Sequence, residues 1–288
     1  LAIKYPPLKE DLLSEIEYDA SVSERDEDSF SKYYDPHHSA KRTKSRKSCQ
    51  LKGLRVPEGR LKIIEGIMPV KEVLQLAKSY NTTLTVMLTS MMLIAFAEEI
   101  PLRQKKKPVI LSVPVNLRNY FQSETARNFF GVIQVGYNFS QGPGTLEDVI
   151  ACVKEEFKRE LTAEQLGARM AALSKAEHNY VARAVPLVIK DLILWTADTI
   201  SESYTAGSIS NIGKIDLPDA AKPFVKRFDV FVSTDKLQAC VCSYGGELTV
   251  SFTSAFRSTN VQKHFFRQLT QAGIPVEIQS NKLEDDLQ

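Results

Sequence analysis

Two polar side chains stand where an apolar run ends in the stretch Pro108 to Phe139, PVILSVPVNLRNYFQSETARNFFGVIQVGYNF. Asn116 and Arg118 follow the first of two runs rich in Val and Ile, so a buried strand would deliver them to its end. At the end of a strand both side chains could line a binding channel. A solvated connection between two strands would have a similar composition, and the stretch leaves both interpretations open.

The paired histidines His37 and His38, in PHHSAKRT, could serve as a general base. A base of this kind needs a dry, preorganised site, and the surrounding residues are polar and charged. We therefore expect both histidines to lie in a linker. His178 and His264 are expected to be ordinary histidines at a helix end and on the polar side of the last helix.

The cysteines Cys49, Cys152, Cys240 and Cys242 are too few and too scattered for a disulfide framework, which favours a cytoplasmic location. Cys240 and Cys242 fall on one face of a predicted strand, but no His or further Cys lies near them in sequence to complete a zinc site. We expect core cysteines and no metal site.

The sequence contains no G-x-S-x-G elbow, P-loop, dinucleotide fingerprint or H-E-x-x-H motif. We therefore expect no catalytic residue in this chain. The net charge is +2, and a generic phosphate binder should carry a clear basic excess. A nucleic-acid partner is not expected.

A chain of 288 residues with 43% apolar content can form one large or two modest globular domains. Its most apolar run, Leu84 to Ala97, is short and contains Thr85, Thr89 and Ser90, so no transmembrane segment is expected. The chain opens with Leu and without a signal peptide, so we expect it to begin inside a longer protein.

Composition divides the chain into four regions. Residues 1–13 are expected to be the end of a helix broken by Pro6 and Pro7. Residues 14–48 join an acidic half to the basic run KRTKSRK with few large aliphatic residues, which predicts a mobile polar linker. The basic run could instead dock on a phosphate or an acidic partner. Residues 49–281 form the folded region, and residues 282–288 form a tail.

Periodicity and turn signals predict a mixed sheet with helices packed on it, an α+β or mixed α/β fold. Besides the two apolar runs of the opening stretch, strands are predicted at residues 48–56, 60–68, 207–215, 227–234, 237–245, 247–256 and 274–280. Helices are predicted at residues 70–79, within 81–100 after a Thr N-cap, and at 146–161, 163–177, 181–200 and 259–273.

Three blocks follow one another in the sequence: SVPVNLRNYFQSETARNFFGVIQVGYNFS, YTAGSISNIGKIDLP and FDVFVSTDKLQACVCSYGGELTVSFTSAF. Together they resemble the C-terminal lobe of the chloramphenicol acetyltransferase-like superfamily, and within it bacterial alcohol acetyltransferases and the condensation domains of peptide synthetases. The resemblance covers residues 1–281 in order. It implies a mixed, largely antiparallel sheet with flanking helices, as one of two similar lobes with a substrate channel between them.

The family signature His-His-x-x-x-Asp-Gly, whose second His is the general base, is absent from the chain. HHSAKRT has Arg42 and Thr43 where the Asp and Gly should stand. LAIKYPPL resembles the end of the helix that follows the motif. The resemblance therefore implies a catalytic His upstream of Leu1, in an N-terminal partner lobe.

By the same resemblance, Asn116 and Arg118 run to the lobe interface, and Ser210, Asn211 and Gly213 of SNIG lie close to them. These residues would hold the lobes in register and offer hydrogen bonds to a carbonyl or oxyanion. Gly213 would allow close backbone approach. The alternative is that the Asn and Arg side chains are buried and only satisfy main-chain groups and carboxylates.

The function that the resemblance implies is acyl-CoA-dependent O-acyl transfer, in which the acceptor attacks the thioester directly. Acyl-CoA would be a co-substrate, no cofactor would stay bound, and the acceptor would be an alcohol or an amine. Two alternatives remain: a non-catalytic binding module of the same fold, and a condensation-type N-acyltransferase that takes its donor from a carrier protein.

Overall fold

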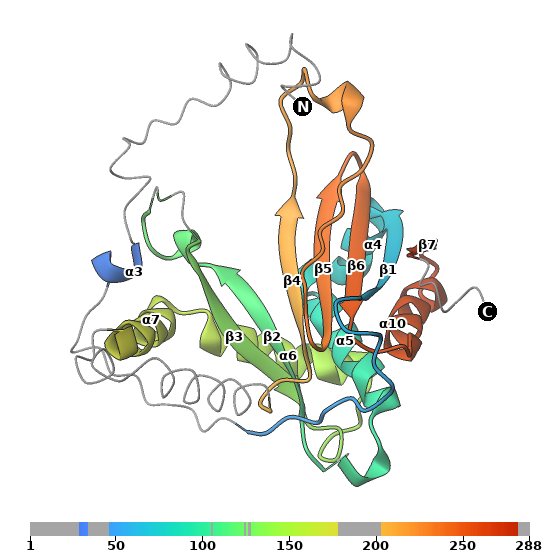
Figure 1. Cartoon of the computed structure of the whole chain (residues 1–288), viewed down its shortest axis with the longest axis horizontal. Helices are drawn as coiled ribbons and strands as arrows, with labels where there is room; N and C mark the ends of the chain where they lie inside the picture. Colours follow the sequence, from blue (N-terminus) through green and yellow to red (C-terminus); the bar gives the residue numbers. More distant parts are fainter. Residues whose placement is uncertain are drawn as a thin grey trace.

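The computed structural model of the chain describes residues 29–33, 46–104, 106–123, 125, 128–177 and 203–281. Within them, one sheet has the strand order β3-β2-β4-β5-β6-β1-β7 (Figure 1). The pairs β2–β4 and β4–β5 are parallel and the other pairs are antiparallel. The predicted fold class is therefore confirmed. The strands are β1 Lys62–Pro69, β2 Val109–Asn116, β3 Phe130–Tyr137, β4 Gly207–Lys214, β5 Leu237–Tyr244, β6 Glu247–Ser254 and β7 Glu277–Ser280.

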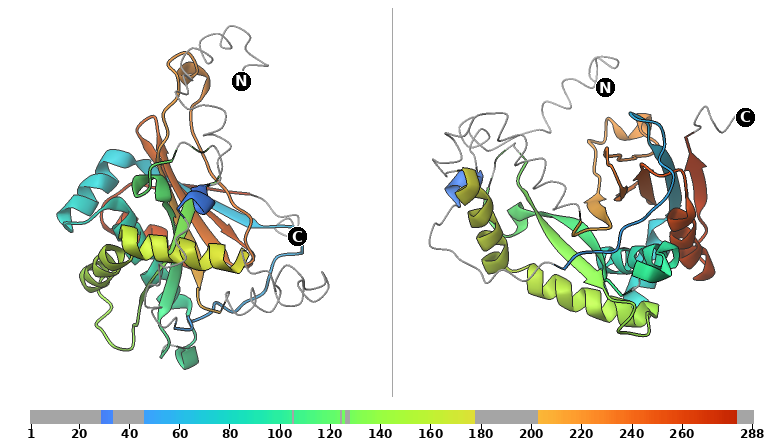
Figure 2. Two further views of the ribbon diagram at one scale, coloured as in Figure 1. Left: turned by 90° about the vertical axis from the view of Figure 1, so that its left-hand side faces the viewer. Right: turned by 60° about the horizontal axis from the view of Figure 1, so that its bottom comes forward.

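Helices cover one face of this sheet. In Figure 2 helices α5, α6 and α10 lie together on the same side, and α5 packs against β2 while α6 packs against β3. The helices are α3 Ser29–Lys32, α4 Val70–Ser79, α5 Leu84–Glu99, α6 Leu146–Glu160, α7 Ala163–Glu177 and α10 Asn260–Gln271. The described residues also form short 3₁₀ turns, η1 Leu102–Gln104, η2 Leu117–Asn119 and η3 Lys222–Phe224.

Helix α5 is central to the core because its sequence is apolar almost all round. It begins at the predicted Thr N-cap, Thr83, whose side chain accepts a hydrogen bond from Val86 N. On the strands it faces, alternate residues point to the helices. Leu111 and Val113 of β2 are buried, whereas Ser112 between them faces the other side of the sheet.

The predicted strand at residues 48–56 is wrong. Residues 46–57 form an extended segment, here called the end strap, that crosses the ends of several strands. Cys49 N donates to Pro108 O before β2, and Val56 N donates to Ala255 O after β6. Only Arg55 forms an isolated bridge, to Phe256. Because its partners belong to different strands, the end strap adds no strand to the sheet.

The predicted strand at residues 227–234 is also wrong. Residues 226–236, here called the face segment, lie on the sheet face opposite the helices. Side chains of the sheet hold their backbone: Cys242 Sγ donates to Phe228 O at 3.3 Å and Thr253 Oγ1 donates to Val232 O at 2.8 Å. The segment is rich in residues that favour strands, and such residues also pack well on the face of a sheet. A segment on a face, however, has no strand edge with which to form backbone hydrogen bonds.

Part of the region predicted to be a mobile linker packs against the core. Phe30 of α3 meets the Phe129 ring edge-on at 5.2 Å, and Tyr33 stacks on the same ring. Ser48 is buried. Mobility of residues 14–48 as a whole stays a prediction. The remaining predictions for residues 1–13, the histidines at 37, 38 and 178, the helix at 181–200 and the tail lie outside the described residues.

Among the residues that the structure describes, no single helix has the length and apolar character needed to cross a bilayer. Helices α4 and α5 meet this requirement only as a pair, and they are bent by 83° relative to each other.

Candidate functional site

Strands β2 and β4 diverge soon after they begin. They pair only through Leu111 with Gly207 and Ser112 with Ser208. The end at which the two strands pair is here called the closed end. The chain is tightly packed there, since a Cβ on Gly207 would lie 2.5 Å from Leu237 O. Beyond it, the edges of β2 and β4 face each other without pairing, and a cleft opens between them.

Pro114 explains why the two strands separate. The carbonyl of Ile110 accepts a hydrogen bond from Ala206 N at 2.7 Å, so the backbone groups of even-numbered residues in β2 point toward β4. Pro114 is such a residue, and it has no N–H to donate. A proline inside a sheet marks a place where pairing stops.

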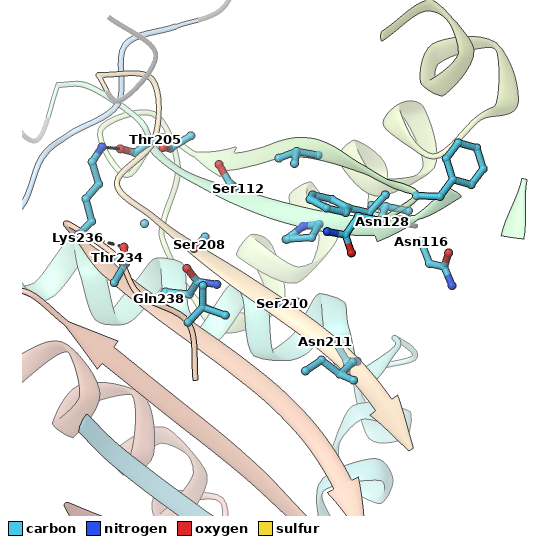
Figure 3. Close-up of a pocket in the computed structure, with 18 of the residues that line it drawn as sticks. Ser112, Asn116, Asn128, Thr205, Ser208, Ser210, Asn211, Thr234, Lys236 and Gln238 are labelled. Carbon is cyan, nitrogen blue, oxygen red and sulfur yellow. Dashed lines mark hydrogen bonds between the residues drawn. The ribbon is translucent and has the colours of Figure 1, made fainter. Parts of the chain in front are cut away.

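The cleft has a volume of about 830 Å³. Figure 3 shows hydroxyl and amide side chains at its closed end and a second polar set at its open end. Of the five residues predicted from the sequence, four line it and Gly213 does not. The closed end includes Ser112, Thr205, Ser208, Thr234, Lys236 and Gln238, and the open end includes Asn116, Asn128 and Asn211.

Asn116 and Arg118 organise the turn that follows β2. Asn116 Oδ1 accepts from Arg118 N at 3.1 Å and caps η2, while Leu117 between them is fully buried. Arg118 Nη2 donates to Thr125 O at 2.7 Å. Both residues are exposed at the rim of the cleft, so the alternative prediction that they are buried is wrong. Its other part, contacts of these side chains with main-chain groups, agrees with the hydrogen bonds described above.

Asn211 connects β4 to the start of α5. Its Nδ2 donates to Thr85 Oγ1 at 2.8 Å, and its Oδ1 accepts from Gly213 N at 2.9 Å. The β4–β5 register shifts between Asn211 and Gly213, so Ile212 forms a bulge. Gly213 has φ +86°, and a Cβ added to it would meet no atom within 4 Å, so backbone conformation, not close approach, requires glycine there.

A hydrogen-bonded cluster fixes the closed end. Lys236 Nζ donates to Thr205 O at 2.7 Å and to Gln50 Oε1 at 3.2 Å. Gln50 Nε2 in turn donates to Thr205 O at 3.0 Å. The end strap thereby joins the segment before β4 to the residue before β5. Nothing in the local sequence around Gln50 indicates this contact, since its partners lie far away in the chain.

The polar face beneath the face segment carries two perturbed groups. Burial, then the nearby Asp229 and Glu65, raise the pKa of Cys242 to about 11. Burial, then Asp229, also raise the pKa of Glu65. The cysteines are free, and burial raises the pKa of each, so they stay thiols at neutral pH. The expected cytoplasmic location stays a prediction.

The described residues hold no cluster of His, Cys, Asp or Glu able to bind a metal ion. Nor does a histidine line the cleft within this part of the chain. The residues that sequence reasoning missed are Ser112, Ser208 and Gln238. Their signal was the alternation of polar residues with buried ones in LSVPVN, SIS and LQA.

Comparisons with protein-family models and with curated proteins found no match. Solved structures do show similarity. A trichothecene 15-O-acetyltransferase from Fusarium sporotrichioides is 13% identical, with a TM-score of 0.52 over 79% of this chain and 48% of its own. The epimerization domain from the third module of tyrocidine synthetase B is 12% identical, with a TM-score of 0.50. The match covers 86% of this chain and 56% of that structure's chain. The nonribosomal peptide synthetase FmoA3 with AMPPNP bound is 15% identical, with a TM-score of 0.51. The match covers 79% of this chain and 23% of the synthetase chain.

These similarities show that the chain shares its fold with an O-acetyltransferase and with proteins of nonribosomal peptide synthesis, in agreement with the fold that the sequence resemblance implied. The chain spans between about a quarter and just over half the length of these three structures. At such low identity the similarity concerns the fold alone.

Proposed function

We propose that this chain is the C-terminal lobe of an acyl-CoA-dependent O-acyltransferase and that the cleft is one wall of its substrate channel. The observation that carries the proposal is the divergence of β2 and β4, which opens about 830 Å³ in a fold shared with an acetyltransferase. A volume of this size is typical of small-molecule sites.

The unpaired strand edges suit the donor. The arm that carries the acyl group in CoA and in carrier proteins is extended and contains secondary amides. Such an arm could lie between β2 and β4 and pair with their free backbone groups, as an added strand does. Pro114 keeps this space open by withholding its own N–H from β4.

In the proposed reaction the acceptor oxygen attacks the thioester carbonyl, a C–O bond forms, the C–S bond breaks and the thiol leaves with a proton. The acceptor proton must pass to a base, which we assign to a His of an N-terminal partner lobe. General-base catalysis contributes about 10²- to 10⁴-fold, so we expect this chain alone to be inactive. Near the open end, Asn116 and Asn128 can donate N–H groups to the carbonyl oxygen.

Two other functions stay open, each with an observation in its favour. The structural contacts of Asn211 and Arg118 favour a non-catalytic binding module, because these side chains already hold the protein together. The similarity to peptide-synthetase domains favours a condensation-type N-acyltransferase with a carrier-protein donor and an amine acceptor.

The test uses the protein together with the region encoded upstream of Leu1. Thiol release is measured with acetyl-CoA or an acetylated carrier protein, and with alcohol or amine acceptors. Ser210→Trp, which fills the cleft, should abolish release, whereas Ser280→Trp on the exposed strand β7 should not. Release only from the carrier protein with an amine would favour the condensation-type enzyme. No release with any pair of substrates would favour the binding module.

A further inference from the structure

Three serine side chains at and near the closed end of the cleft have hydroxyl groups that the described part of the chain leaves available. Ser112, Ser208 and Ser210 all line the cleft and are half-buried (Figure 3). Among the residues that the structure describes, none offers a hydrogen bond to these hydroxyl groups. Their neighbours behave differently: the Thr205 carbonyl accepts from Lys236, and Thr234 Oγ1 accepts from Lys236 N.

The register of the strands groups the three hydroxyls. Ser112 is the direct partner of Ser208 on the adjacent strand, and Ser210 follows two residues later on the same face. Strand geometry puts such positions about 5 Å apart across the pair and about 7 Å apart along β4. Gln238 pairs with Ser208 from the other side and adds a carboxamide. One small molecule can therefore contact all of them.

We infer that these serines form a subsite for a neutral acceptor with several hydroxyl groups, such as a sugar or another polyol. The role of this ligand as an acceptor rests on the proposed function, whereas the binding of a polyol at these serines does not depend on it. A serine hydroxyl both donates and accepts, as the hydroxyl groups of such a ligand do. The spacing of the serines is comparable with the separation of hydroxyl groups on opposite sides of a sugar ring.

Other ligand classes fit these positions less well. An alkyl chain would bury the hydroxyls without replacing their hydrogen bonds to water. A charged group is not favoured, because the cations of the cleft, Lys236 and Arg118, direct N–H groups to backbone carbonyls. The amide-bearing donor arm would pair in the plane of the strands, whereas these side chains stand perpendicular to the sheet. The donor and the polyol can thus occupy different sides of one cleft.

The test measures binding of maltose and myo-inositol to the full-length protein by titration calorimetry, with 1-octanol as the apolar comparison. Ser112→Ala, Ser208→Ala and Ser210→Ala should each weaken binding of the preferred polyol about three- to tenfold, the range expected for one hydrogen bond. Ser280→Ala on β7 is the matched control and should change nothing. Circular dichroism confirms that each variant is folded.

Several outcomes separate this inference from the proposed function. If neither polyol binds, or if the three alanine variants bind as the parent does, the subsite is wrong, whatever the result with acyl donors. Preference for 1-octanol together with thiol release would overturn the subsite and leave acyl transfer standing. Serine-dependent polyol binding without thiol release from any donor would support the subsite and overturn the acyltransferase.

Discussion

Asn211 shows at the scale of a single residue how a predicted site residue acquires a structural role. Its amide joins Thr85 in the first turn of α5 to the bulge at Ile212. A role in donating to the substrate carbonyl stays a prediction. If Asn211 also serves the reaction, its effect on turnover has to be separated from its effect on stability.

We expect Asn211→Ala to lower the free energy of unfolding by about 1–3 kcal/mol, because it removes two hydrogen bonds and leaves Gly213 N without its acceptor. Thr85→Val is the control, since it removes only the bond to Thr85 and should cost less. Urea unfolding measures both. If activity in the complete enzyme falls in Asn211→Ala and not in Thr85→Val, the amide has the catalytic role as well.

Glu65 gives a pH-dependent prediction. Its pKa is raised in the folded state above the ordinary value of 4.5, first by burial and then by Asp229. A carboxyl with a raised folded pKa stabilises the fold below its ordinary pKa, and this contribution is lost as the pH rises through the folded pKa. Glu65→Gln should therefore raise the Tm at neutral pH, and the gain should vanish at pH values below about 4.5.

Thermal melts from about pH 4 to about pH 8 check this expectation. Glu58→Gln, in the exposed turn before β1, is the matched control and should melt like the parent. A Tm gain in Glu65→Gln that is the same at every pH would mean that titration of this carboxyl is not the cause.

At the scale of elements, the β2–β4 pair decides whether the cleft exists. Pro114→Val supplies the missing N–H and a residue that favours strands, so we expect pairing to extend beyond Ser112 and Ser208. The amide of residue 114 should then exchange slowly with solvent, and donor binding should weaken at least tenfold. Pro143→Val, in the exposed loop before α6, is the control. Rapid exchange at residue 114 with unchanged binding would contradict the role given to this proline.

The end strap should stabilise the closed end through Gln50 and Lys236. Because both side chains belong to one cluster with Thr205 O, the effects of Gln50→Leu and Lys236→Met should not add. We expect a coupling energy of about 1 kcal/mol in a double-mutant cycle measured by urea unfolding. Lys52→Met, exposed on the same strap, replaces Gln50→Leu in the control cycle and should show no coupling. Additive effects would mean that the strap does not hold the cleft.

At the scale of the whole molecule, exposed apolar side chains gather at the cleft. Phe130, Val132, Ile212 and Val232 all line it, and each is between 42% and 49% exposed. An apolar surface of this kind marks a binding face. We expect the chain alone to self-associate and to bind a hydrophobic dye, because the partner lobe that we propose is not there to cover this face.

Light scattering at several concentrations measures the association. Phe130→Ser combined with Val132→Thr should reduce it, whereas Ile278→Thr on the opposite edge of the sheet, which is 50% exposed, should not. A monomer at all concentrations that binds no dye would count against the proposed lobe interface.

Local sequence patterns were enough to predict most of the elements and the fold class. Residues 70–79, 146–160 and 163–177 repeat their apolar positions with helical spacing, and β4, β5 and β6 carry strand-forming residues bounded by turns such as Gly245-Gly246. These signals are local, since backbone geometry sets the spacing along one element. Of the candidate residues, Asn116, Arg118, Ser210 and Asn211 were found in this way and by resemblance, and all four line the cleft.

What those elements do together depends on contacts between distant parts of the chain. Residues 48–56 and 227–234 have strand-like sequences but are not strands, because a strand also needs a free edge, and one segment crosses strand ends while the other lies on a face. Pro114 keeps the cleft open only because the backbone nitrogen that lacks a hydrogen faces β4. Ser112 lies beside Ser208 only because β2 and β4 are parallel neighbours. Pairing between distant segments depends on the packing of the whole sheet, and no local pattern carries that information.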